Sequence, residues 1–435
     1  SGRWRGDNKL DDKAYFELAN GHFRENSGLS GTLVVKDNGV LQVDVTGEQV
    51  DLRPFLSENG TAKDMGASVS GGQDAGTAGS ASSADKPEFS IININLTAKR
   101  FYAKGDNPVV ENGKITYRRR NQDSEIEVVA DKFDARPWII STSSTSADNG
   151  NGRDANSAET APQGPASGGI GEETSRRGGK KEIFLDFGEL LAARNQVVKG
   201  LKGSIHVEGD EWRSIVLNGK LDGTADLFAH VEPVDGGKRK VQLTSDDAGR
   251  FLAAIDLYGD LRGGKLNVQG MVDDHKYSQP FTGSAHIENF RIVNAPLGAR
   301  VLNAASLLGL VDSLQGKGII FDAMDGDFTY ANDVLTLSKV AANGAAIGVT
   351  ANGSIDLATD EIRLAGSIVP FYALNSVLGK IPLIGDLLVG EEGGGVFAPT
   401  YTVEGAVENP DISVNPLSTI VPGVFRNLIT GAKPG

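Results

Sequence analysis

Cysteine is absent from this chain of 435 residues. Without a thiol the protein forms no disulfide bond, holds no metal through a thiolate and has no cysteine nucleophile. The absence does not fix the compartment, because oxidising and reducing compartments both contain proteins without cysteine. Aromatic residues are also scarce, at 6%, whereas glycine is abundant, at 56 residues. This composition favours many short strands and tight turns over a thick core.

Positive charge is in short supply. The 43 Lys and Arg residues face 57 Asp and Glu residues, which gives a formal net charge of -14. Binding to nucleic acid depends on Lys and Arg displacing counterions, so we expect no nucleic-acid partner. The same balance argues against docking on anionic lipid surfaces by electrostatics alone.

Long apolar runs are missing. No run reaches the roughly 18 apolar residues of a membrane-spanning helix, and the first residues lack the basic and apolar regions of a signal peptide. Two interpretations follow: a soluble protein, or a protein whose membrane anchor lies outside this chain. We favour the second because of the family resemblance described below.

Motifs that carry catalysis are also missing. The five histidines include no pair at the i, i+4 spacing of a zinc helix, and no nucleophile elbow, phosphate loop or dinucleotide fingerprint occurs. Asp322, Asp325 and Asp327 faintly suggest a calcium loop but lack its spacing and closing Glu, so a hairpin turn is the better interpretation. We expect no enzyme activity, no metal and no cofactor.

Two segments are poor in bulky apolar residues. Residues 57–86 and 141–182 consist mainly of Gly, Ser, Ala, Asn and Asp, and they cannot bury enough surface to offset the entropy of ordering. We interpret both as disordered insertions. The second ends in Arg176, Arg177, Lys180 and Lys181, which either contact a phosphate or headgroup or, more simply, are solvated loop charges.

Elsewhere apolar and polar residues alternate with a period of two. This pattern is typical of strands with one buried and one wet face, in an antiparallel sheet. Asn-Gly pairs at Asn112, Asn218 and Asn352 mark hairpin turns or bulges inside strands. We therefore predict a mainly β protein: an elongated, curled antiparallel sheet forming an apolar groove. Its candidate lining residues are Leu41, Val43, Val45, Ile92, Ile94, Leu335, Leu337, Ile362, Leu364, Tyr401 and Val403.

Helical spacing is rare. We expect a possible helix over residues 11–25, one over 295–315, two short ones within 370–388 and a last piece within 416–430. Most of these lie near the C-terminal end of the chain.

The C-terminal third resembles the AsmA-like family, in particular its YhdP-type members. The residues that carry the resemblance are FTGSAHIENFRIVNAPLGARVLNAASLLGL from Phe281, GKGIIFDAMDGDFTYANDVLTLSKVAANGAAIGVTANGSIDL from Gly316, VPFYALNSVLGKIPLIGDLLVG from Val369 and PTYTVEGAVENPDISVNPLSTIVPG from Pro399. The order and spacing of these segments are specific. The earlier strands are compatible with the family's repetitive β-region but do not identify it.

The resemblance implies a location and a function. Family members are anchored in the inner membrane by an N-terminal helix and project into the periplasm as a bent β-gutter. They are thought to conduct phospholipid between the inner and outer membranes. The resemblance therefore implies phospholipid or another acyl-chain lipid as ligand, both membranes as partners, and periplasmic localisation with an anchor outside this chain.

These expectations divide the chain into six parts. They are a β-region with a possible helix (1–56), an insertion (57–86), a β-region (87–140), a second insertion (141–182), a β-region (183–280) and the AsmA-like C-terminal region (281–435). Two alternatives stay open. The apolar residues can be the closed core of an ordinary β-sandwich, and the protein can be an outer-membrane scaffold or assembly factor that carries no lipid.

Overall fold

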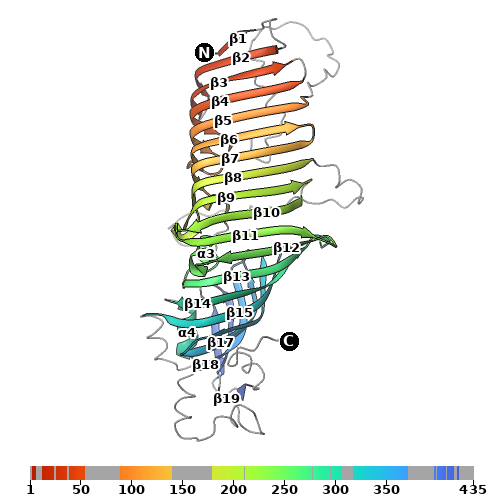
Figure 1. The fold of residues 1–435 in the computed structure, drawn as a ribbon. Coiled ribbons are helices and arrows are strands. Elements are labelled where there is room, and N and C mark those ends of the chain that lie inside the picture. The colour runs from red at the N-terminus through yellow and green to blue at the C-terminus, as the bar shows by residue number, and fades with distance from the viewer. Residues whose placement is uncertain are drawn as a thin grey trace, which may run out of the picture.

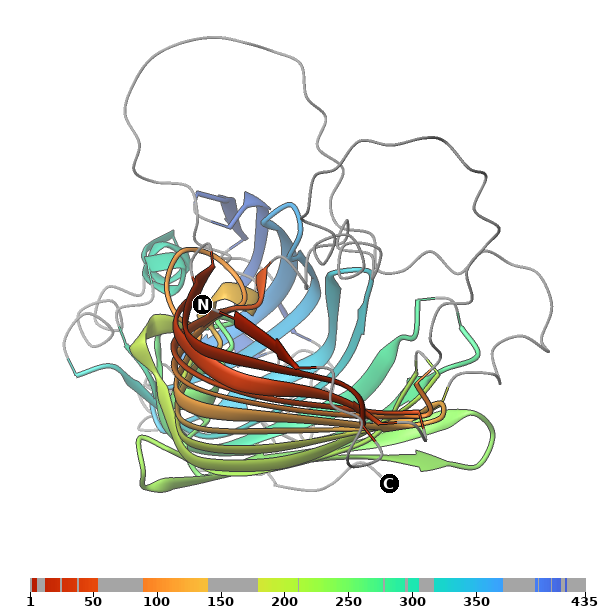
Figure 2. The same ribbon diagram turned by 90° about the horizontal axis from the view of Figure 1, so that it is seen from above.

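The computed structural model is a long, curled β-sheet with few and short helices (Figure 1). The structure describes residues 2–5, 12–23, 26–36, 39–53, 89–139, 179–209, 211–276, 278–293, 296–304, 317–370, 396–397, 399–407, 409–415 and 419–420. Viewed down the stack of strands, the sheet is bent into an open trough (Figure 2). The prediction of an elongated, curled, mainly β fold is confirmed.

The main sheet has twenty strands. They are β1 (Gly2–Arg5), β2 (Asp12–Phe23), β3 (Asn26–Lys36), β4 (Val40–Asp51), β5 (Ile91–Tyr102), β6 (Val110–Arg120), β7 (Asp123–Asp134), β8 (Lys180–Leu191), β9 (Val197–Glu208), β10 (Glu211–Leu221), β11 (Ala225–Val234), β12 (Lys238–Ser245), β13 (Leu261–Asp273), β14 (Phe281–Ile292), β15 (Ile319–Ala331), β16 (Val334–Asn343), β17 (Ile347–Asp356), β18 (Glu361–Pro370), β20 (Thr400–Ala406) and β21 (Asp411–Asn415). A separate pair joins β19 (Val396–Phe397) to β22 (Thr419–Ile420). The described helices are η1 (Arg136–Trp138), η3 (Ala193–Asn195), α3 (Ala248–Ala254) and α4 (Pro296–Ala304).

Each strand of the main sheet pairs with the next one along the chain. Most of these pairs are antiparallel, but β4–β5 and β7–β8 are parallel. A parallel pair needs a connection that returns across the sheet. Residues 52–90 join β4 to β5 and residues 135–179 join β7 to β8; they contain the first predicted insertion and most of the second. The insertions therefore lie in the two connections that bring the chain back to start a parallel strand. The alternation of apolar and polar residues does not show which strands are parallel.

One row of directly paired residues runs across the sheet from β3 to β21 and contains only apolar residues and glycine. Directly paired residues share a face of the sheet, so the row marks one apolar face. We call it the apolar row. Its members are Leu33, Val43, Ile94, Tyr117, Ile126, Ile183, Ile205, Ile215, Val231, Val241, Gly270, Gly283, Phe328, Leu337, Gly353, Leu364, Val403 and Ile412.

The neighbouring row lies on the opposite face and is mainly polar. From β4 to β15 it consists of Asp44, Asn95, Thr116, Glu127, Phe184, Ser204, Val216, His230, Gln242, Gln269, Ser284 and Asp327. We call the two sides the apolar face and the polar face. Within the described part of the chain, no second large sheet packs against either of them. The sandwich alternative therefore does not describe this fold.

Aligned bulges bend the strands. On β5 to β9 the ladder skips one residue at about the same height, at Asn112 on β6, Asp131 on β7 and Gly200 on β9. Asn112 has φ 48° and Gly200 has φ 59°, the left-handed conformation found at bulged residues. Because each strand carries its extra residue at the same height, the strands turn together and the register is kept.

The Asn-Gly pairs at Asn112, Asn218 and Asn352 lie inside strands β6, β10 and β17. The bulge interpretation, not the hairpin one, therefore holds for them. The acidic stretch from Asp322 to Asp327 also lies inside a strand, β15, so the predicted hairpin turn is wrong. In the described chain no cluster of three or more acidic or His side chains is arranged to hold a metal ion.

The helix expected over residues 11–25 is wrong, because this segment is strand β2, paired with β1 and β3. The helix expected over 295–315 is confirmed in its first part as α4, and its remainder lies outside the described residues. Of the segment 370–388, where two short helices are expected, only Pro370 is described, and it ends strand β18. Of the piece expected within 416–430, only Thr419–Ile420 is described, and it is a short strand.

The predicted division of the chain into six parts stays a prediction, but one of its boundaries can be compared with the strands. Strand β8 begins at Lys180, so the second predicted insertion ends too late, and Lys180 and Lys181 are strand residues instead of loop residues. The rest of both insertions lies outside the described residues. Among the described helices, none has the length and apolar character needed to cross a bilayer.

Candidate functional site

The apolar face is covered at two places and half-exposed between them. One buried cluster lies over β13 to β20 and includes Phe290 and Val403, at 2% and 1% exposure. The other lies at one end of β4 to β10 and includes Phe101 and Leu221, both fully buried. Helix α3 sits between the clusters, and its Phe251 packs against both. The covered parts act as the core of the protein, and the residues of the apolar row between them are half-buried.

An apolar pocket of about 300 Å³ opens on this face in the C-terminal part of the sheet. Strands β14 to β18, strand β20 and helix α4 all contribute to its lining, so the sheet curls around this face. The main lining residues are Phe290, Phe321, Val301, Leu302, Leu364 and Tyr401. The pocket has twice the volume of an engineered cavity of about 150 Å³ that binds benzene. It is large enough for a stretch of hydrocarbon chain.

Helix α4 forms one side of the pocket. Val301 and Leu302, at 6% and 5% exposure, point from the helix into the apolar cluster. Arg300 ties the helix to the far edge of the sheet: its Nη2 donates to the carbonyl of Pro410 over 2.8 Å, and its Nη1 to Asn409 Oδ1 over 3.2 Å. Helix α4 follows β14 in the chain but lies next to β21, so it connects two parts of the curled sheet that are several strands apart.

The polar groups on the β17 and β18 side of the pocket are satisfied by one another. The hydroxyl of Tyr401 donates to the carbonyl of Thr350 over 2.8 Å, and the hydroxyls of Thr350 and Ser367 are 2.7 Å apart. Burial raises the pKa of Tyr401 to about 12. These three hydroxyl groups therefore already have hydrogen-bond partners within the described part of the chain.

Two further ionisable groups line the mouth of the pocket. Burial raises the pKa of Asp260, and the positive charges of Arg262 and Arg194 offset part of this effect. Burial and the nearby Asp260 carboxylate also raise the pKa of Tyr258 well above its usual range. Both shifts reflect an environment that disfavours charge.

The eleven candidate lining residues all lie on the apolar face, in two groups. One group is on β4 and β5, where Leu41 pairs with Ile92 and Val43 with Ile94. The other is on β16 to β20. Only Leu364, Tyr401 and Val403 line the pocket, while Ile362 is buried in the cluster beside it. A lipid-binding role for these residues stays a prediction.

The prediction missed the aromatic part of the pocket. Phe290 and Phe321 stack with their ring centroids 5.1 Å apart, and they are adjacent in the ladder. Ile287 and Phe290 are three positions apart, which breaks the period of two, because Asn289 between them is a bulged residue with φ 54°. The side chains of Val301 and Leu302 come from a helix, so alternation gives no signal for them.

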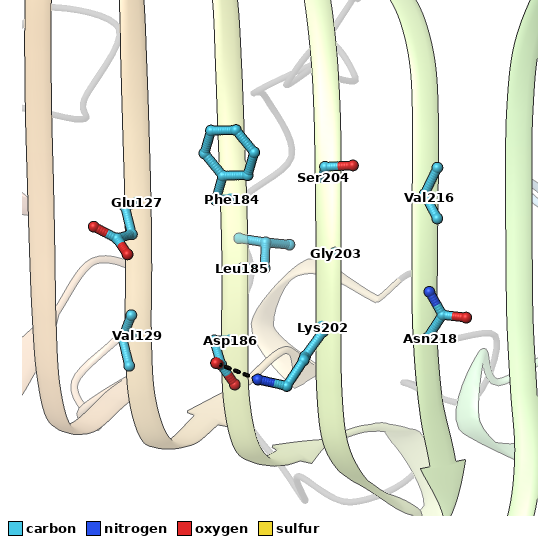
Figure 3. Close-up of a pocket in the computed structure, with 10 residues that line it drawn as sticks. All are labelled: Glu127, Val129, Phe184, Leu185, Asp186, Lys202, Gly203, Ser204, Val216 and Asn218. Carbon is cyan, nitrogen blue, oxygen red and sulfur yellow. Dashed lines mark hydrogen bonds and ion pairs between the residues drawn. The ribbon is translucent and has the colours of Figure 1, made fainter.

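A second hollow, of about 410 Å³, lies mainly on the polar face over β7 to β10 (Figure 3). It is shallow and mixed in character. Phe184 and Val129 are 40% and 38% exposed there, and Lys202 forms an ion pair of 2.6 Å with Asp186 on its floor. A shallow hollow with an internal ion pair is a weaker ligand site than the apolar pocket, which is less open and lined mainly by apolar side chains.

His286 also lies on the polar face, between two carboxylates. Its Nδ1 is 2.7 Å from Asp325 Oδ1 and its Nε2 is 3.0 Å from Glu288 Oε1. Partial burial opposes protonation of the imidazole, but the hydrogen bonds to Glu288 and Asp325 outweigh it, so the pKa of His286 is raised. The contact of His286 with Asp325 links β14 to β15.

Comparison of the chain with family models, with curated proteins and with solved structures finds no match. The resemblance to AsmA-like proteins therefore stays a prediction.

Proposed function

We propose that this protein shelters the acyl chains of a lipid on its apolar face while the lipid headgroup stays in water. The observation that carries the proposal is the apolar row, which runs unbroken from β3 to β21 with no second large sheet against it among the described residues. A core that served stability alone would need a partner layer along its whole length.

The energetics favour such a face as a path for lipid. Exposing an acyl chain of about twelve methylenes to water costs roughly 10 kcal/mol, at about 0.8 kcal/mol for each methylene. A chain that moves along a continuous apolar surface avoids most of this barrier. Twenty strands about 4.8 Å apart make a sheet roughly 90 Å long, so one molecule offers a long path.

The resemblance to AsmA-like proteins supports a cellular setting for this activity. We infer that the chain is the periplasmic part of an envelope protein anchored in the inner membrane by a segment outside this chain, and that it conducts phospholipid between the inner and outer membranes. Sheltering and movement of lipid need no bond-breaking step, so we propose no enzyme activity.

The test is native mass spectrometry, with extraction and identification of lipids, on protein purified from a bacterial host. We expect co-purifying lipid in the wild-type protein and its loss in Leu364→Asp, which puts a charge into the pocket, and in Ala351→Phe, which fills the pocket without adding charge. Val129→Asp is the matched control, because it introduces the same charge on the polar face, where Val129 is 38% exposed.

Each outcome separates the proposed function from its alternative. Lipid-free wild-type protein that also fails to take up a labelled phospholipid would refute the proposal and leave the scaffold or assembly factor. Lipid retained equally in all three variants would place the ligand elsewhere on the molecule.

A further inference from the structure

The apolar face is bordered at one end of strands β6 to β8 by a row of polar residues. Along the ladder, Ile92 pairs with Arg119, Arg119 with Ser124, and Ser124 with Lys181. Directly paired residues share a face, and Arg119 and Lys181 are two residues from Tyr117 and Ile183 of the apolar row. Both cations therefore stand on the apolar face, at its border. We call Arg119, Ser124 and Lys181 the basic rim.

The basic rim holds positive charge that no described carboxylate neutralises. The nearby carboxylates are on the polar face and have other partners: Glu125 pairs with Arg118, and Glu182 lies 3.8 Å from His206 Nδ1. Arg119 Nη2 donates to the carbonyl of Phe89 over 3.0 Å, which is a neutral partner. Arg119 and Lys181 thus bring two positive charges to one border of the apolar face, with Ser124 on the strand between them.

Arg119 also has a donor without an acceptor. Its Nε is buried and has no hydrogen-bond partner among the described residues. A buried donor without an acceptor is costly, so a ligand oxygen at this position would be favoured. The bond to Phe89 fixes the guanidinium plane, and a fixed guanidinium suits the tetrahedral oxygens of a phosphate group.

The other end of the same strands is closed and apolar. Phe133 and Phe187 stack with their centroids 4.7 Å apart, and on the neighbouring strands β9 and β10 Val198 and Leu221 are 5% and 0% exposed. The trough is therefore polar and open at one border and apolar and closed at the other. An amphipathic ligand has only one favourable orientation in it.

We propose that the basic rim binds the phosphate of an anionic headgroup, so that Arg119 and Lys181 flank the phosphate above Ser124 and the acyl chains point towards Phe187. The two cations stand on alternate strands, about 10 Å apart, which leaves room for one phosphate between them. This inference rests on the proposed function and adds to it a ligand class and an orientation.

The experiment measures the affinity of the purified chain for three probes by calorimetry: dodecyl phosphate and monododecanoyl glycerol, both below the concentrations at which they aggregate, and inorganic phosphate. The test variant is Arg119→Gln/Lys181→Gln. The control variant is Arg120→Gln/Lys180→Gln, which makes the same change in charge on the adjacent positions of the polar face. We expect the wild-type and control proteins to bind dodecyl phosphate about tenfold more tightly than the neutral probe.

In the test variant this preference should disappear while the affinity for the neutral probe stays unchanged, which also shows that the variant is folded. A preference that survives in the test variant, or falls equally in the control, overturns the proposal. Inorganic phosphate that binds as tightly as dodecyl phosphate shows a free-anion site and overturns the headgroup assignment. If neither acyl probe binds the wild-type protein, the proposed function itself fails.

Discussion

Two isoleucines on the apolar face test whether this face is open or packed. Ile205 on β9 belongs to the apolar row, is half-buried and is part of neither buried cluster. Ile287 on β14 lies on the same face, is 2% exposed and is part of the cluster beside the pocket. Both are interior strand residues, so the same substitution to alanine isolates the difference in what covers them.

The expected costs differ by a factor of three or more. Ile287→Ala removes fully buried methyl and methylene groups and leaves a cavity, and such a change lowers the free energy of unfolding by about 3 to 4 kcal/mol. Ile205→Ala removes the same atoms from a side chain that water already reaches on one side, and it leaves no closed cavity. Its cost should be about 1 kcal/mol.

Amide hydrogen exchange followed by mass spectrometry is the suitable measurement. In a stack where each strand contacts only its neighbours, unfolding is local and one global free energy is not well defined. Exchange in β8 to β10 and in β13 to β15 reports the two sites separately. If Ile205→Ala speeds exchange around β9 as much as Ile287→Ala does around β14, a packed layer covers the face and the open trough is wrong.

Three further predictions concern the local stability of the sheet at a bulge, at a buried ion pair and at a histidine between two carboxylates. Gly200→Ala should lower the local free energy of unfolding by about 1 kcal/mol through backbone strain alone, because φ is 59° and no atom lies within 4 Å of the added Cβ. Asp274→Ala should cost about 3 kcal/mol, because it removes the carboxylate partner of Arg239, whose side chain is only 11% exposed, and leaves the neutral acceptors of Trp212 and Gln279. The pKa of His286 is raised in the folded state. The stabilisation that its protonation gives is therefore complete below the unfolded value of about 6.5 and is lost as the pH rises through the folded pKa, and His286→Asn should remove this dependence.

Hydrogen exchange in the flanking strands checks each of these predictions. Unchanged exchange in β8 to β10 would show that the bulge at Gly200 relaxes without cost. Unchanged exchange in β12 to β14 would mean that water replaces Asp274. For His286, a pH dependence of exchange in β14 and β15 that persists in the variant would assign it to another group.

The sequence predicted those features of the fold that depend on period-two alternation. Alternation places Val43 and Leu364 on a buried side whatever their partners are, so the single apolar face followed directly. The prediction was wrong for residues 12–23, which form strand β2 where a helix was expected. There the backbone pairing with β3 outweighs a weak local preference for helix.

The features that depend on long-range geometry could not be predicted. Nothing in alternation distinguishes a parallel neighbour from an antiparallel one, so the β4–β5 and β7–β8 pairs were missed. The pocket was only partly foreseen, because Phe290 stands after a bulge and Leu302 comes from a helix that reaches it across the curl. Of the basic rim, the sequence singled out only Lys181, within the basic cluster at the end of the second insertion. Arg119 and Ser124 were missed, because the three residues meet only through the pairing of strands that lie far apart in the sequence.

The bulges of neighbouring strands are matched from β5 to β9. A slip of a single residue between two strands would move every following side chain to the other face. An extra residue in one strand alone would do this, but here Asn112, Asp131 and Gly200 stand at the same height on β6, β7 and β9. From β5 to β9 the shifts cancel between neighbours, and what remains there is a common bend. Between β9 and β10, and on both sides of β16, the register shifts by one residue, and the apolar row passes to one side of these unmatched bulges. A continuous apolar row and a curved sheet are the two properties that a surface for acyl chains needs.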